Sequence, residues 1–372
     1  MNLTIGSREI RAEARPLPPR TVRLLVPVAS VCVALIIGAA ILAAVGQNPV
    51  AAYKEVVRSG LLSQRSFVGT LLVATPLILT ALAAVVAFRM KIWNIGAEGQ
   101  LIMGAVAASG AALWLGDSVA SPIIIAVSLL AGVAAGAIWA YLAAMPRAYL
   151  NTSEVISTLM LNFVALGVMN YLIFSSISSW RNAERLTFPS GRFIDAAAFL
   201  PRVWGRLHIG LFLALAAAVF VWWVLRSTRW GFEVEVTGDS VRAAEYAGMR
   251  VDRKIVSVML LSGGLAGLGG GIEITGVLHN LDPRALSLGV GFTGIVVAAI
   301  ARLSALGVIP VAVLVASLTT AGPGLQASGI PPEIVLLLEG ILFLCVVAGE
   351  WFLRFTVRVH PVAKGVTPVE AR

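Results

Sequence analysis

Residues 66–88 read SFVGTLLVATPLILTALAAVVAF and contain no Asp, Glu, Lys or Arg. A membrane-spanning helix needs about 20 apolar residues, since the hydrocarbon layer is ~30 Å thick and each helical residue rises ~1.5 Å. This stretch is therefore long enough to cross a bilayer. Comparable stretches recur along the chain, so we expect an all-α, polytopic integral membrane protein with about ten transmembrane helices.

The composition also points to the bilayer as the solvent of this chain. Of its 372 residues, 58% are hydrophobic and 13% charged, and the mean hydropathy is +0.90. An average soluble domain carries about 25% charged residues. A water-soluble globular enzyme is therefore excluded. Disordered and collagen-like chains are excluded as well, because the 36 Gly and 17 Pro follow no triplet period.

The expected spans fall into three groups. Residues 285–332 hold one charge, Arg302, and several glycines and prolines, so they predict two short, broken helices or, equally, re-entrant segments. Three segments carry one to three acidic residues each: 95–115, 255–277 and 333–353. Five segments carry no Asp, Glu, Lys or Arg: 24–46, 66–88, 118–146, 155–180 and 207–225.

The distribution of basic residues predicts the orientation. Residues 1–23 contain five arginines, and the apolar run that follows is too long for a secretory signal, so it predicts an anchor. With this end in the cytoplasm, 19 of the 28 Lys and Arg fall on the inner side and nine on the outer. We therefore expect cytoplasmic tails at 1–23 and 354–372 around a membrane domain at 24–353.

Two connecting loops are long enough to favour a function over a plain solvated connection. The outer loop, 181–206, mixes charged and aromatic residues and predicts a docking surface. The inner loop, 226–254, contains a stretch from Asp239 to Met249 that predicts a short amphipathic helix.

The sequence offers no support for catalysis, metal binding or nucleic-acid binding. The three histidines are scattered, HExxH and GxSxG are absent, and no lysine follows a glycine, so a phosphate-binding P-loop is missing. Residues 289–294 match GxGxxG but lie in an apolar segment, where breaking a helix is the favoured interpretation. Cys32 and Cys345 are expected to be inert buried thiols.

Polar residues cluster at two places inside expected spans. In the first cluster, residues 93–100, glycines accompany Asn94, Glu98 and Gln100. In the second, Glu154, Ser157, Thr158 and Asn162 follow at i, i+3, i+4 and i+8, which places them on one helical face. Each cluster predicts either a translocation pathway or gate, or helix packing held by polar side chains, and the two hypotheses are about equal.

A third pattern predicts close helix packing. Gly263, Gly267 and Gly271 recur every four residues, so one side of that helix lacks side chains and lets a neighbouring helix approach.

Five motifs occur in order over most of the chain: NIGAEGQ at 94–100, EVISTLMLN at 154–162, AAEYAGM at 243–249, SGGLAGLGG at 262–270 and GFTGIVVA at 291–298. With these motifs the chain resembles the permease subunits of bacterial ABC importers in the branched-chain amino acid, ribose and nucleoside group, and most closely the nucleoside and simple-sugar branch. A departure is Ile300-Ala-Arg302-Leu-Ser304, where relatives commonly have Leu-Gly-Arg followed by proline.

The resemblance implies a bacterial inner-membrane subunit without enzymatic activity that moves a nucleoside or a simple sugar. It implies an ABC ATPase partner that uses ATP, a second permease chain in a heterodimer, an extracytoplasmic solute-binding protein, and no cofactor bound by this chain itself. Membrane lipid is the remaining partner. The resemblance further assigns a coupling segment that docks on the ATPase, formed by Gly238, Asp239, Ala243, Ala244 and Gly248.

The alternative is an ion-coupled secondary transporter, which would need intramembrane carboxylates to carry protons or sodium. Glu98 and Glu273 are its candidates. A membrane-embedded enzyme ranks third, because no nucleophile, base and metal can be assembled.

Overall fold

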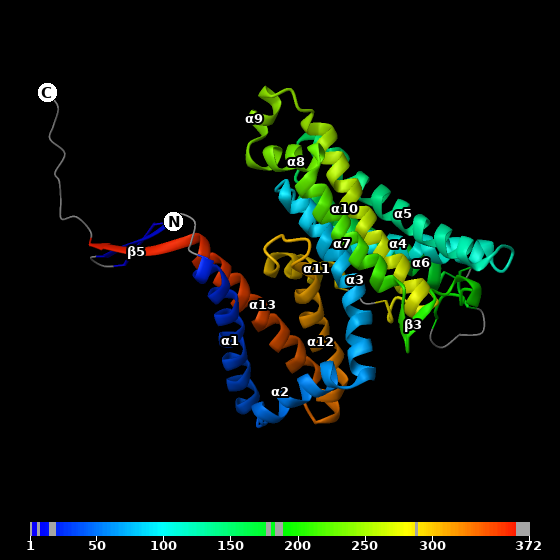
Figure 1. Ribbon diagram of the computed structural model, residues 1–372, viewed down its shortest axis with the longest axis horizontal. Helices are drawn as coiled ribbons and strands as arrows, with labels where there is room; N and C mark the ends of the chain where they lie inside the picture. Colours follow the sequence, from blue (N-terminus) through cyan, green and yellow to red (C-terminus); the bar gives the residue numbers. More distant parts are fainter. Residues whose placement is uncertain are drawn as a thin grey trace. The chain divides into compact units, whose positions relative to one another are not determined.

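The computed structural model describes residues 2–5, 8–14, 20–175, 180–182, 189–286 and 289–361. The chain is predominantly helical (Figure 1). It divides into two compact units, one formed by residues 1–52 and 330–372 and the other by residues 53–329. Helix α2 (Pro49–Val57) joins them along the chain.

The first unit pairs two long helices, α1 (Arg20–Ala44) and α13 (Pro332–Arg354). They come close where Gly349 lies beside Ser30, because a side chain at Gly349 would clash with the Ser30 hydroxyl. Both cysteines are free, but Cys32 lies on the exposed face of α1 and Cys345 is half-buried. The expectation of two buried thiols is therefore wrong for Cys32.

The same unit contains a three-stranded antiparallel sheet that the sequence analysis missed. Strand β2 (Arg8–Ala14) lies between β1 (Asn2–Ile5) and β5 (Phe355–Pro361). Arg8 pairs with Pro361 and Ala14 with Phe355. Alternating residue types in FTVRVHP are typical of strands, whereas the distribution of basic residues predicted only cytoplasmic tails at both ends of the chain.

The second unit is a helical bundle with a distinct structure at each end (Figure 1). Helices α8 and α9 follow the C-terminus of α7 at one end of the bundle. The short strands β3 and β4 precede the N-terminus of α7 at the other end. Its elements are η1 (Arg58–Leu62), α3 (Gln64–Arg89), α4 (Ala97–Leu115), α5 (Ser121–Leu150), α6 (Glu154–Phe174), η2 (Ala196–Ala198), β3 (Arg202–Trp204), β4 (Leu207–His208), α7 (Gly210–Ser227), α8 (Arg229–Asp239), α9 (Val241–Tyr246), α10 (Val251–Glu273), η3 (Ile274–Leu278), α11 (Val290–Ile300) and α12 (Val308–Ala327).

Seven helices among the described residues are long and apolar enough to cross a membrane: α3, α5, α6, α7, α10 with η3, α12 and α13. The apolar parts of α1 (Val28–Ala44) and α11 are shorter. A polytopic, predominantly helical membrane protein is therefore confirmed. The described part of residues 285–332 contains two helices, as predicted, and α11 is short. Helix α12, however, is neither short nor broken, because it is one continuous helix of 20 residues despite Pro323.

Glycines let α10 approach two neighbours closely. Gly267 lies against Gly132 and Gly136 of α5 and against Gly104 of α4, and a side chain at Gly267 would clash with the backbone of α5. Gly263 meets Gly136 in the same way. The predicted glycine-lined packing face of α10 is confirmed.

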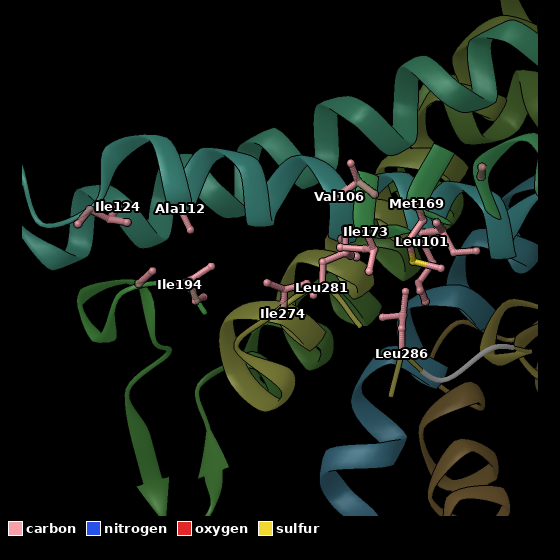
Figure 2. Close-up of a cluster of buried hydrophobic side chains, with 14 residues drawn as sticks. Leu101, Val106, Ala112, Ile124, Met169, Ile173, Ile194, Ile274, Leu281 and Leu286 are labelled. Carbon is pink, nitrogen blue, oxygen red and sulfur yellow. The ribbon is translucent and has the colours of Figure 1, made fainter. Parts of the chain in front are cut away.

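The described part of the loop between α6 and α7 packs onto the β3–β4 end of the bundle. Ile194 N donates to the His279 carbonyl and Leu200 N to the Thr275 carbonyl, both at 2.9 Å. Ile194 also belongs to a buried apolar cluster with Ala112 and Ile124 (Figure 2). Much of this loop therefore has a structural role, although Phe193, Val203 and Trp204 are exposed. The predicted docking surface also includes residues 183–188, which lie outside the described residues.

Candidate functional site

Asn94 is completely buried in the turn between α3 and α4 and uses both ends of its amide. Its Nδ2 donates to Gln100 Oε1 at 3.0 Å and to Ser262 Oγ at 2.8 Å. Its Oδ1 accepts from the Gly96 N–H and from Gln100 Nε2, each at 3.0 Å. Ser262 in turn donates to the Ala83 carbonyl at 2.7 Å. The turn is thereby fastened to the interior of both α3 and α10.

Asn162 fastens the same turn to α6. Its Oδ1 accepts from the Gly99 N–H at 2.8 Å, and its Nδ2 donates to the Ile95 carbonyl at 2.9 Å. A side chain at Gly99 would clash with Asn162, so a glycine is required for this approach. The two predicted clusters therefore form one site.

Glu98 joins this site to the start of α11. One carboxylate oxygen accepts from the Gly289 N–H at 2.5 Å and the other from the Gly291 N–H at 2.7 Å. The first N–H groups of a helix lack partners within the helix and attract negative charge. Glu98, only 4% exposed, thus caps a helix whose N-cap residue, Gly289, lies 191 residues later in the chain.

The remaining members of the second cluster lie towards the start of α6. Glu154 accepts from the Trp93 N–H at 3.4 Å and forms an ion pair with Arg147, whose Nε lies 3.2 Å from a Glu154 carboxylate oxygen. Thr158 is buried, and its hydroxyl donates to the Glu154 carbonyl at 2.6 Å. Ser157 is only half-buried and bonds to its own helix. The buried face of α6 therefore contains Thr158 and Asn162, with Ser157 at its margin.

In this conformation the buried cluster fits the helix-packing hypothesis well. Asn94, Gln100, Asn162 and Glu98 all bond to protein groups, and two cavities of about 390 and 380 Å³ in the second unit are lined by other residues. The cluster holds five helices, α3, α4, α6, α10 and α11, together at one joint. A role in the translocation pathway stays a prediction.

Helix α8 is attached to the ends of α3 and α10. Gly238 packs on the Arg89 carbonyl, where a side chain would clash, and Lys91 Nζ lies 3.5 Å from Asp239 Oδ1. Glu233 pairs with Lys254 of α10 at 2.5 Å. The hydrogen bond from Lys254 lowers the pKa of Glu233 below its ordinary value of 4.5, so this pair persists at neutral pH and weakens only in acid.

Helix α9 is shorter than the sequence predicted, because caps close it at both ends. Ser240 has an extended backbone and accepts from the Ala243 N–H at 3.2 Å, which starts the helix. Gly248 has φ +77°, and the Met249 N–H bonds back to the Ala244 carbonyl at 3.0 Å, which ends it. The expected helix from Asp239 to Met249 is therefore wrong at both ends.

The coupling residues named from the sequence consequently differ in accessibility. Ala243 and Gly248 are exposed, whereas Ala244 and Gly238 are buried within the second unit. Tyr246, a residue that the sequence analysis did not name, is 97% exposed.

Residues 66–347 match the family described as the permease component of the branched-chain amino acid transport system. This match covers most of the chain. The chain belongs to that permease family.

Relatives of this permease cover nearly its whole length. It is 33% identical over 346 residues to the guanosine ABC transporter permease protein NupP of Bacillus subtilis, covering 90% of this chain and 96% of the relative. It is 34% identical over 361 residues to the nucleoside ABC transporter permease protein NupB of Lactococcus lactis, covering 95% and 97%.

It is also 34% identical over 366 residues to the glucose ABC transporter permease protein TsgB13 of Haloferax volcanii, covering 94% of each chain. A second guanosine permease protein of Bacillus subtilis, NupQ, is 29% identical over 60% of this chain and 70% of its own length.

Several partners that complete the buried cluster of this permease could not be predicted from its sequence. Ser262 is one serine in a run of small residues, and Thr80, which donates to the Val290 carbonyl at 3.2 Å, lies in a charge-free span. Gly289 and Gly291 contribute only backbone N–H groups. Single hydroxyls and backbone donors leave no pattern in a sequence.

Proposed function

We propose that this permease is the pore-forming subunit of an ATP-driven ABC importer that moves nucleosides across the bacterial inner membrane. The observation that carries this proposal is similarity to NupP and NupB over at least 90% of the chain. A simple sugar is the alternative solute, supported by the similar match to the glucose permease TsgB13.

We propose that the working assembly contains a second, different permease chain, an ABC ATPase and an extracytoplasmic solute-binding protein. NupP and NupQ come from one bacterium and are both guanosine permease proteins, yet this chain matches NupP over 90% and NupQ over 60% of its length. That difference favours a heterodimer.

The attachment of α8 supports its use as the coupling segment. Gly238 touches Arg89, and Asp239 pairs with Lys91. These two contacts fall on the residues just before the turn that carries Asn94. Movement of α8 by a partner would therefore act directly on the joint between α3, α4, α6, α10 and α11.

In the proposed topology, α1, α4 and the segment that contains the short helix α11 cross the membrane in addition to the seven long helices, which makes ten crossings. The excess of basic residues on one side supports cytoplasmic termini and a cytoplasmic α8–α9 end.

Transport should require ATP hydrolysis by another chain. Proteoliposomes with this permease alone should take up neither labelled guanosine nor glucose, whereas the full complex with ATP should take up its solute. Omitting ATP or the ATPase from the complex is the control. Uptake driven by a proton or sodium gradient through the permease alone would contradict the proposal and support a secondary transporter.

Truncating Tyr246 should weaken capture of the ATPase. Its ring is almost fully exposed at the tip of α9, and burying an aromatic side chain in a partner's groove contributes about 2 kcal/mol or more to binding. Tyr246→Ala should therefore lower the affinity about 30-fold, measured by titrating the ATPase onto the reconstituted permease.

Trp114→Ala is the matched control. Trp114 is also exposed, at 84%, but it lies in the last turn of α4, whereas the first turn of α4 is the one next to the α8 contacts. Equal affinities for wild type and Tyr246→Ala would remove α9 from the docking surface. Gly248 is a poorer test site, because any side chain at φ +77° also disturbs the backbone.

A further inference from the structure

A polar cavity of about 390 Å³ lies at the α8–α9 end of the second unit. Its walls come from the last turn of α3, the end of α7, helix α8 and the turn between α11 and α12. Three arginines line it, Arg89, Arg226 and Arg302, together with Glu235 and Trp222. The lining is therefore basic, with three guanidinium groups against one carboxylate.

Glu235 forms only a long, exposed ion pair with Arg89. Its carboxylate lies 3.8 Å from Arg89 Nη1, and the two side chains are 62% and 39% exposed. Ion pairs this long and this exposed contribute about 0–1 kcal/mol. Nη2 of Arg89 donates to the Leu303 carbonyl at 3.4 Å. This bond connects α3 to the turn between α11 and α12, which are two walls of the cavity.

The backbone and an aromatic ring position the other two arginines. Arg302 and Leu303 have φ of +55° and +56°, a left-handed conformation that costs about 1–2 kcal/mol per residue for side chains other than glycine. Such conformations persist where the surroundings hold them and concentrate at binding sites. Arg226 lies over the Trp222 ring at 5.8 Å, and stacking of this kind leaves the N–H edge of a guanidinium available to an anion.

Tryptophans mark the depth of this cavity in the bilayer. Trp222 and Trp223 lie in the last two turns of the membrane-spanning helix α7, and they are 37% and 52% exposed. Tryptophan is enriched at the level of the lipid headgroups. Arg226 follows them by one turn, so the cavity lies where phosphate groups are concentrated.

We propose that this cavity binds the phosphate group of an anionic phospholipid. The guanidinium fork matches phosphate geometry, and basic pockets at a membrane boundary bind lipid headgroups. A soluble phosphate offers the same chemistry, but the depth set by Trp222 and Trp223 favours the lipid. The proposal depends on membrane insertion and not on the transported solute, so it can fail or succeed independently of the proposed function.

The test is a titration of the purified full-length permease with phosphatidylglycerol, followed by native mass spectrometry. Arg226→Gln combined with Arg302→Gln should lower the affinity about 30-fold, since each interfacial arginine contributes about fivefold. Arg242→Gln with Arg250→Gln removes two exposed arginines outside the cavity lining and should leave the affinity unchanged. Phosphatidylcholine should bind more weakly than phosphatidylglycerol.

Two further arms separate the lipid from other anions. Equal phosphatidylglycerol affinity in the wild type and the cavity variant would overturn the proposal. Displacement of the lipid by an equal concentration of inorganic phosphate would also overturn it and assign the cavity to a soluble anion. A cavity variant that keeps its lipid affinity but no longer captures the ATPase would instead assign the arginines to the partner protein.

Discussion

Replacing Gly267 by valine should prevent the permease from accumulating as a folded membrane protein. Gly267 lies at the point where α10 meets both α4 and α5, and even a Cβ atom there would overlap the backbone near Gly132 and Gly136. Backbone cannot move aside as a flexible side chain can. The cost should be about 3 kcal/mol or more, at or beyond the upper end of ordinary overpacking, against a total stability of about 5–15 kcal/mol.

Gly167→Val is the matched control for this prediction. Gly167 is exposed on α6, and a side chain there meets nothing within 4 Å in the described part of the chain. Both variants make the same chemical change in the middle of a membrane helix. Gly167→Val should lower expression and monodispersity in detergent only slightly. Gly267→Val should abolish both almost completely. Similar behaviour of the two variants would disprove the close contact between α10 and α5.

Hydropathy predicted most of the long helices but fewer of the details at their ends. The charge-free run at 66–88 became α3 (Gln64–Arg89), and 255–277 became α10 with η3, because lipid demands continuous apolar length whatever the packing. The ends of α9 depend instead on the Ser240 cap and the Gly248 turn. Ser240 and Gly248 could be recognised in the sequence as a cap and a turn residue. The predicted helix nevertheless included them, because its bounds came only from the helical spacing of its residues.

The candidate site could be predicted as residues but not as an arrangement. The spacing from Glu154 to Asn162 placed Thr158 and Asn162 on one buried face of α6, which the structure has. Nothing in the sequence joined that face to the turn at 94–100, since Asn162 bonds to the backbone of Ile95 and Gly99. Contacts from side chains to distant backbone groups depend on the fold and have no local pattern.

Removing the charge of Glu98 should lower both the stability of the permease and its transport. Both carboxylate oxygens accept backbone N–H groups, from Gly289 and Gly291, at the start of α11. Hydrogen bonds to a charged group contribute about 1.5–3 kcal/mol each, and a buried N–H left without a partner costs about 1–3 kcal/mol. Glu98→Ala should therefore destabilise the permease by about 3 kcal/mol or more.

Glu98→Gln should also be damaging, although glutamine has nearly the same shape. Its amide offers one oxygen and one NH₂ group, so one of the two backbone N–H groups would face a second donor instead of an acceptor. The variant also loses the attraction between a negative charge and the start of a helix, which is about 0.3–1 kcal/mol at exposed sites and up to ~2 kcal/mol when partly buried. Glutamine should thus lie between wild type and alanine.

Measuring two properties on the same preparation separates capping from a role in the pathway. If Glu98 acts as a cap, the melting temperature of the reconstituted complex and its ATP-driven nucleoside uptake should fall together, in the order wild type, Gln, Ala. Glu333→Gln is the control, because Glu333 lies in the first turn of α13 but is exposed, so its loss should change the melting temperature little. Removing a carboxylate that holds α11 in position must lower the melting temperature. An unchanged melting temperature with lost uptake would therefore contradict the capping role and assign Glu98 to the gate or the solute path.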